Sequence, residues 1–463
     1  MANETANSAV PIDTRTIHKL KIRLLPFLFV LYVVAFLDRI NIGFAALTMN
    51  KELAITSQQF GLIAGIFFIG YVIFEVPSNL LLHRIGARIW IARILLSWGI
   101  VAMLTGFVQS VAQFYVVRFL LGVAEAGFFP GIVLYLTYWF RQREQAHAIA
   151  LFMTALPVAS ILGAPVSGVI LDHAHWLGVS SWRWLLILEG LPAIGCAVLT
   201  YFLLPDRPED ATFLTQNEKE WITAELRREE LQKLQSHQMS ATQALTNRRV
   251  WQLGLTALAW DMGLYWMSFW MPQVLKSLSS LYSNTLVGFL VVIPQLVGLV
   301  GMVLVSRSSD RSLERRFHTA IPAIVGGTAL LLLTMTRSFV ESIALLSLMA
   351  AGIYSFIAPF FTIPSEFLSG YSAASGIALI NSVANIGAFV GPYAIGAITG
   401  KTRSLSGGMA FAGVSLLTSA TLALLLPRKA RANVTGAPTS HNGTAKTKRG
   451  GIGIPPRGIA ARR

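Results

Sequence analysis

The stretch from Leu24 to Leu47 is an apolar run that carries two adjacent charges, Asp38 and Arg39. It is long enough to cross a bilayer as one helix, because a span needs about 20 apolar residues. At about 1.5 Å rise per residue, Asp38 lies roughly 20 Å in from Leu24, within a hydrocarbon core of about 30 Å. A charge at that depth is costly unless it is paired or faces a water-filled cavity. The pattern predicts either an ion pair that holds helices together or a proton or substrate site.

The composition indicates a chain whose surface largely faces lipid. Hydrophobic residues make up 54% of the 463 residues, charged residues make up 13%, and the mean hydropathy is +0.60. Soluble globular proteins carry about 25% charged residues. The single cysteine, Cys196, excludes a disulfide within the chain. Because the sequence has no clustered metal-ligand spacing and no Walker sequence, we expect no metal, no cofactor and no use of ATP.

Twelve apolar segments are near or above the length that a membrane span needs. They cover residues 24–47, 58–81, 90–109, 112–138, 146–171, 182–204, 250–275, 283–305, 318–336, 340–362, 371–397 and 405–427. The longest polar stretch, 205–249, divides them six and six. The sequence therefore predicts an all-α integral membrane protein with one six-helix bundle at 24–204 and a second at 250–427. Within the central loop, apolar residues near helical spacing in 218–234 indicate an amphipathic helix on the membrane surface.

Positive charge is unevenly distributed between the short loops. If both termini lie on one side, the loops of that side hold thirteen Lys and Arg residues and those of the other side hold six. Such an excess marks the cytoplasmic face, so we expect residues 1–23, the central loop and the tail 428–463 in the cytoplasm. The tail has nine Lys and Arg residues and no Asp or Glu. This composition is typical of a disordered segment drawn to anionic lipid, and we expect no nucleic-acid partner.

The two halves contain matching features at a nearly constant offset. His83–Arg84 follows the second segment and Asp310–Arg311 follows the eighth, 227 residues later. Gly163-Ala-Pro165 in the fifth segment is matched by Gly391-Pro392 in the eleventh. Gly and Pro interruptions at corresponding positions of two repeats indicate a transporter cavity at the interface between the repeats.

Four stretches carry a resemblance to a known family: FLDRINIGFA, RFLLGVAEAGFFPG, WRWLLILEGLP and GIALINSVANIGAFVGPY. Together with the six-plus-six pattern and the basic loop after the second segment, they resemble the major facilitator superfamily and, within it, the anion:cation symporter family. The resemblance covers residues 15–427 and is nearest to bacterial tartrate- and rhamnonate-type permeases. It implies a secondary transporter rather than an enzyme, in a bacterial inner membrane. His83 departs from the superfamily pattern, which usually has Asp there.

Charged residues in the first and fourth segments are the main site candidates. Arg118 and Glu125 are seven residues apart, so they share one helical face about 10 Å apart along the axis. An Arg–Glu network that staples helices is the alternative to a site. The resemblance implies that Asp38 and Glu125 are proton sites and that Arg39 binds the substrate carboxylate. Arginine suits that role because its planar fork can hold a carboxylate with two hydrogen bonds while staying charged.

Further candidates rest on weaker patterns. The resemblance makes Tyr71 a candidate substrate contact, and Arg118 is a second arginine that can hold the anion once its carboxylate partner is protonated. Asn381 and Asn385 share a helical face and can bond substrate hydroxyls. Packing between helices is the alternative for the tyrosine and the two asparagines. Two more acids, Glu75 and Asp261, are candidates without a matching family motif. The candidate gating loops contain Arg84, Gly86, Arg88, Asp310 and Arg311.

These observations predict proton-coupled uptake of a small organic anion, such as tartrate or a sugar acid, by alternating access in a monomer. Carboxylate substrate, protons and the lipid bilayer are the expected partners. An aromatic carboxylate transporter or an anion exchanger is the alternative within transport, and the aromatic residues around Asp261 are its only hint. A membrane receptor or sensor that does not transport is the alternative from another class.

Overall fold

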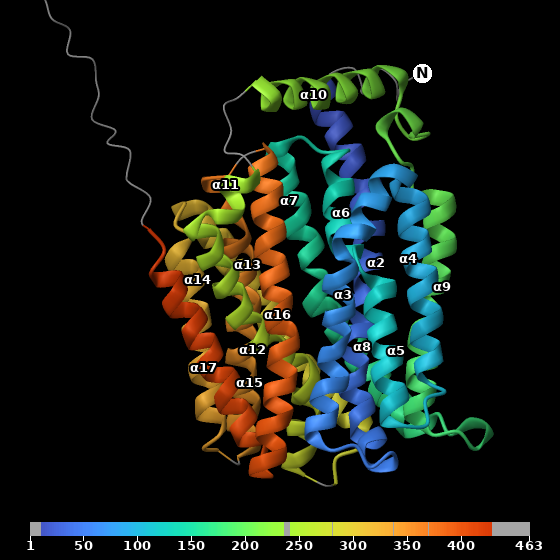
Figure 1. Ribbon diagram of the computed structural model, residues 1–463, viewed down its shortest axis with the longest axis vertical. Helices are drawn as coiled ribbons and strands as arrows, with labels where there is room; N and C mark the ends of the chain where they lie inside the picture. Colours follow the sequence, from blue (N-terminus) through green and yellow to red (C-terminus); the bar gives the residue numbers. More distant parts are fainter. Residues whose placement is uncertain (1–10, 236–240, 280, 337, 369, 428–463) are drawn as a thin grey trace, which may run out of the picture. The chain divides into compact units, whose positions relative to one another are not determined.

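The computed structural model describes residues 11–235, 241–279, 281–336, 338–368 and 370–427. The predicted tail 428–463 and the first ten residues of the N-terminal segment lie outside this part of the chain. All regular structure in the described residues is helical (Figure 1). In the first half the helices are α2 (Ile12–Glu52), α3 (Ser57–Ile85), α4 (Ala87–Thr105), α5 (Val111–Glu125), α6 (Phe128–Thr137), α7 (Gln142–Met153), α8 (Ala155–His173) and α9 (Ser181–Leu203).

The central loop contains α10 (Gln216–Gln235) and α11 (Ala241–Thr246). The second half contains α12 (Arg248–Leu278), α13 (Asn284–Ser312), α14 (Arg316–Leu333), α15 (Phe339–Thr362), α16 (Gly370–Thr402) and α17 (Leu405–Leu424). Short 3-10 turns lie at Trp176–Gly178, Pro208–Asp210 and Pro364–Glu366. Within each half, neighbours such as α4 and α9, or α14 and α17, pack along their length, whereas α3–α16, α8–α13 and α2–α12 join the halves.

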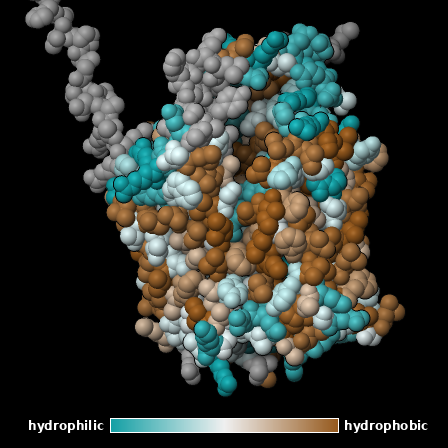
Figure 2. All heavy atoms as spheres, viewed as in Figure 1, coloured by the Kyte–Doolittle hydropathy of each residue, from teal (hydrophilic) through white to brown (hydrophobic). Residues whose placement is uncertain are grey.

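Eleven spans in the described residues, two of them broken into helix pairs, are long and apolar enough to cross a membrane. The twelfth expected span corresponds to α12, which is 31 residues long but does not meet that hydropathy criterion. Most of its tryptophan and tyrosine side chains, including Trp260, Tyr265 and Trp270, are buried, whereas Trp251 is exposed. We count α12 as a span because it packs against α2, α16 and α17. Figure 2 shows a hydrophobic belt between more hydrophilic ends.

The fourth predicted span is broken where the sequence suggested one continuous helix. α5 ends at Glu125, Ala126 is extended, and α6 begins at Phe128. Gly127 between them has φ +83°, and a Cβ there would lie 2.5 Å from Ser78 Oγ on α3. Only glycine combines that backbone conformation with so close an approach. The break leaves Glu125 at a helix end in the middle of the span.

α10 lies across one end of the helices (Figure 1), which we call the α10 end. Its Glu218 is fully buried and accepts hydrogen bonds from Arg15 Nε at 2.8 Å and Lys19 Nζ at 2.9 Å, both on α2. Burial by itself would raise the pKa of the Glu218 carboxyl, but hydrogen bonds from Lys19 and Thr215 lower it below its ordinary value. These contacts attach the central loop to the first half.

At the opposite end, the two halves meet through backbone and capping contacts. The Asp172 carboxylate on α8 accepts hydrogen bonds from the backbone N–H groups of Asn284 at 3.2 Å and Thr285 at 2.7 Å. These groups open α13, so an acid from one half caps a helix of the other. A Cβ on Gly288 would lie 2.3 Å from the Ala164 carbonyl oxygen. This close approach indicates that the opposite end is closed.

Candidate substrate site

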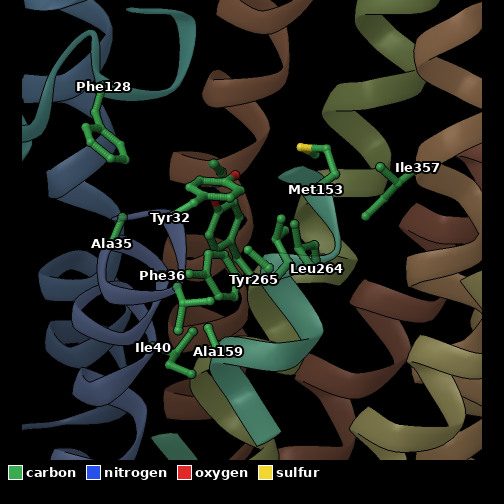
Figure 3. Close-up of a cluster of buried hydrophobic side chains, with 14 of the residues drawn as sticks. Tyr32, Ala35, Phe36, Ile40, Phe128, Met153, Ala159, Leu264, Tyr265 and Ile357 are labelled. Carbon is green, nitrogen blue, oxygen red and sulfur yellow. The ribbon is translucent and has the colours of Figure 1, made fainter. Parts of the chain in front are cut away.

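A cavity with about 70 Å³ of free volume lies between the halves. Its polar lining comes from Arg39 on α2, Asp261 on α12, and Asn381 and Asn385 on α16. The aromatic lining residues include Tyr32, Phe36, Tyr71, Phe129, Trp260, Tyr265, Phe360 and Phe361. Figure 3 shows Tyr32 and Phe36 on α2 together with Leu264 and Tyr265 on α12. A cavity with mostly aromatic walls and a few polar groups suits a small ligand with one or more ionic or hydroxyl groups.

Arg39 is the cation of this cavity. Its Nη2 forms an ion pair with Glu125, and its Nη1 lies 3.4 Å from the hydroxyl of Tyr265. The guanidinium also lies over the rings of Phe67 at 5.2 Å and Tyr71 at 5.6 Å. The Nε has no hydrogen-bond partner among the described residues. Arg39 is therefore held by one carboxylate and two aromatic faces, with donor capacity left over.

Glu125 occupies its position because of the break after α5. Its side chain is 2% exposed, and Arg39 is its ion-pair partner. A buried carboxylate without a cation is costly, so the charge on Glu125 and the orientation of Arg39 depend on each other. Protonation of Glu125, or a competing carboxylate at Arg39, would each break this pair.

Arg118 and Asp38 lie near the cavity but do not line it. Arg118 Nε donates to the Ile63 carbonyl at 3.4 Å, and its guanidinium lies 5.4 Å from the centre of the Phe67 ring that also faces Arg39. One of its nitrogens, Nη2, has no partner within the described chain. Both arginines therefore contact the Phe67 ring, but only Arg39 lines the cavity. A substrate role for Arg118 stays a prediction.

Asp38 faces α4 rather than the cavity. Its carboxylate accepts from Trp98 Nε1 at 2.8 Å and from Asn41 Nδ2 at 3.4 Å. Asn41 also interacts with Glu189 on α9, which accepts from Ser167 Oγ at 2.7 Å. The sequence analysis did not find this link, although Asp38 and Asn41 lie three residues apart and share a helical face. A proton site at Asp38 stays a prediction, and the structure places it on the side of α2 away from the cavity.

Glu75 and Asn381 form a contact between the halves. Asn381 Nδ2 on α16 donates to Glu75 Oε1 on α3 at 2.6 Å. The Asn381 side chain therefore lines the cavity and also bonds Glu75 in the other half. Asn385, one turn further along α16, lines the cavity, as does Tyr71. The structure thus gathers five of the predicted side chains around one space: Arg39, Tyr71, Asp261, Asn381 and Asn385.

The candidate gating loops have partners that their spacing did not predict. Gly86 has φ +103°, and Asp206 accepts a hydrogen bond from the Arg88 backbone N–H at 2.8 Å, which caps α4. His83 Nδ1 lies 3.1 Å from the Tyr138 hydroxyl. In the second loop Asp310 pairs with Arg315 at 2.7 Å, while Arg84 and Arg311 are exposed. An acid far along the chain, Asp206, contacts the first loop.

Membrane-spanning helices in two halves, around a central cavity that is closed at one end, are typical of a multi-pass membrane transporter. Comparisons with known proteins agree. The Major Facilitator Superfamily profile matches residues 28–392. The chain belongs to this superfamily of transporters and is not an enzyme.

Two relatives and one solved structure illustrate the similarity. An Agrobacterium vitis protein whose name provisionally assigns it to tartrate transport is 44% identical over 91% of this chain and 97% of its own length. The Escherichia coli K12 inner membrane transport protein RhmT is 37% identical over 81% of this chain and 87% of its own. A bacterial homologue of the human lysosomal transporter Spinster, in an inward-facing and unoccupied conformation, shares the fold with a TM-score of 0.68. That structure is 18% identical and covers 87% of this chain and 95% of its own.

Proposed function

We propose that the protein takes up a small organic anion, such as tartrate or a sugar acid, together with protons across a bacterial inner membrane. The observation that carries the proposal is the Arg39–Glu125 ion pair beside the central cavity. The name of the Agrobacterium vitis relative supports an organic acid as substrate, and that of the Escherichia coli relative supports the inner membrane.

In the proposed cycle, a proton on Glu125 neutralises the carboxylate that holds Arg39. The freed guanidinium then binds the carboxylate of the incoming anion, for which its fork geometry is suited. Asp38, on the side of α2 that faces α4, takes a second proton, which weakens its attraction for Arg118. The α10 end is the cytoplasmic one in this proposal. The basic loops, residues 11–23 of the N-terminal segment and the central loop lie there.

Alternating access then follows from rocking of the two halves about the cavity. Contacts at the opposite end, such as Asp172 with Thr285, must break for the anion to enter from outside. Proton release toward the cytoplasm restores the Arg39–Glu125 pair and expels the anion. Protons that travel with the anion offset the electrical cost of bringing negative charge into the cell, about 2.3 kcal/mol per charge per 100 mV.

Uptake into proteoliposomes under an inward proton gradient tests the coupling. Glu125→Gln removes the proton site while keeping the shape of the side chain. We expect the variant to lose the anion accumulation that the proton gradient drives. Glu220→Gln makes the same chemical change on the exposed face of α10 and serves as the matched control. Gradient-driven accumulation at the wild-type level in Glu125→Gln would refute the coupling role of this acid.

The second candidate is transport of an aromatic carboxylate, or exchange of anions. The aromatic cavity wall, including Trp260, Tyr265 and Phe360, favours it because flat rings can stack on these side chains. Competition for uptake by benzoate-type acids, compared with aliphatic acids of equal charge, separates it from the first candidate.

A further inference from the structure

Asp261 is an acid in the cavity that the proposed cycle does not use. It lies on α12, is 8% exposed, and lines the same cavity as Arg39. Within the described ranges, no hydrogen bond or ion pair involves the Asp261 carboxylate. A carboxylate that is nearly buried and faces a cavity without a partner is left to be satisfied by what enters the cavity.

Asp261 and Arg39 are held at a spacing that the helix geometry sets. Tyr265, whose hydroxyl contacts Arg39 Nη1, lies four residues after Asp261 on the same face of α12. Four residues rise about 6 Å along a helix axis. The Cα atoms of Asp261 and Tyr265 are therefore about one helical turn apart on the face of α12 that lines the cavity. A chain of a few carbon atoms can reach the acid with one end and the cation beside Tyr265 with the other.

The charges around the cavity do not favour a second negative group. Arg39 is the cation in the cavity lining, and Glu125 already shares its charge. When Glu125 takes a proton, Arg39 can neutralise one substrate carboxylate. In its ionised form, which burial opposes and the positive charge of Arg39 favours, Asp261 is then a second negative group in the same lining. A second substrate carboxylate near Asp261 would be repelled by the Asp261 carboxylate in a poorly solvated space. A substrate hydroxyl there would instead donate a hydrogen bond to that carboxylate.

We propose that Asp261 makes the site selective for hydroxylated monocarboxylates over dicarboxylates: Arg39 binds the carboxylate and Asp261 accepts a hydrogen bond from a hydroxyl at the far end of the substrate. This inference rests on the proposed function, since it uses Arg39 as the carboxylate-binding group. Within the proposed substrates it favours sugar acids over tartrate.

A matched pair of ligands isolates this effect. Threonate and tartrate have the same four-carbon chain and the same two internal hydroxyls, and differ only in a terminal hydroxymethyl group or carboxylate. Binding of each to the purified full chain, measured by calorimetry at pH 7.5, should favour threonate by at least tenfold. In Asp261→Asn we expect tartrate to bind more tightly, and the ratio to fall by tenfold or more, because the repulsion is gone.

The outcomes separate this inference from the proposed function. If the wild type binds tartrate as well as threonate, or if Asp261→Asn leaves the ratio unchanged, the selectivity role of Asp261 is overturned while anion transport stands. If Arg39→Ala binds both acids as tightly as the wild type does, or the wild type binds neither, the anion site itself is refuted and this inference with it. Asp261→Ser provides a second uncharged variant, and a wild-type ratio near one overturns the inference even if neither variant folds.

Discussion

At the scale of single residues, the acids inside the membrane differ in how they are satisfied. Glu125 has a cation, Asp38 has two hydrogen-bond donors, and Asp261 faces the cavity. Glu189 is different again, because its Oε2 atom is buried without a partner in the described residues, and so is Asn41 Oδ1. We hypothesise that Glu189 carries a proton on Oε2 and donates it to Asn41 Oδ1, which would satisfy both atoms at once.

Glu189 variants test that assignment. Glu189→Gln keeps a donor toward Asn41, so we expect uptake and thermal stability close to those of the wild type. Glu189→Ala leaves Asn41 and Ser167 unpaired and should cost about 1–3 kcal/mol, measured as lower thermal stability in detergent. Strong destabilisation by Glu189→Gln, of the same size as by the alanine variant, would show that Glu189 is ionised.

At the scale of elements, α10 is attached to the first half by one buried acid. Glu218 has a pKa below its ordinary value, after the opposing effect of burial, because Lys19 and Thr215 donate hydrogen bonds to it. A lowered pKa in the folded state stabilises the fold at pH values above the unfolded pKa of about 4.3. That contribution is lost as the pH falls through the lowered folded-state value.

Glu218→Gln should therefore reduce thermal stability by about 1 kcal/mol at pH 7, with the difference from the wild type disappearing toward pH 3. Unfolding curves in detergent over this pH range measure it. The matched control is Glu220→Gln on the same helix, because Glu220 is exposed and its hydrogen bond to Gln216 stays within α10. A stability difference for Glu218→Gln that persists unchanged at pH 3 would contradict the ion-pair account.

At the scale of the whole molecule, the halves approach most closely at the opposite end. Gly288 on α13 lies so close to α8 that an added Cβ would meet the Ala164 carbonyl oxygen. Gly288→Val should push the halves apart there and favour the conformation open at that end. Ser268 on α12 lines a small space together with Ala164 on α8 and Val291 on α13. In a Cys196→Ser background, we expect an impermeant maleimide to label Ser268→Cys several-fold faster in the Gly288→Val variant.

The control is Gly195→Val on α9, because nothing lies within 4 Å of a Cβ added at that glycine. It should leave the labelling rate of the cysteine at position 268 unchanged. Equal labelling of this cysteine in the Gly288 and Gly195 variants would mean that the close approach does not control opening at this end.

The sequence alone was sufficient for the class of fold and for the charged and amide residues that line the cavity. Membrane spans can be recognised from long apolar runs, because lipid requires about 20 apolar residues whatever the rest of the chain does. Arg39, Asp261, Asn381 and Asn385 were candidates for the same reason, since polar groups in such runs need a partner or a cavity. Tyr71 was a candidate only through the family resemblance. The α12 span, which is rich in tryptophan and tyrosine, is less hydrophobic than the eleven spans that meet the hydropathy criterion.

Only the tertiary structure decided which of these polar groups meet. The direction of a side chain around a helix can be derived from sequence spacing, but the neighbour it meets depends on how the helices pack. Asp38 and Arg39 are adjacent in sequence, yet one binds Trp98 and the other Glu125, because successive residues on a helix point about 100° apart. The break after Glu125 and the pairing of Asp206 with the α4 loop likewise depend on contacts between segments far apart in the chain.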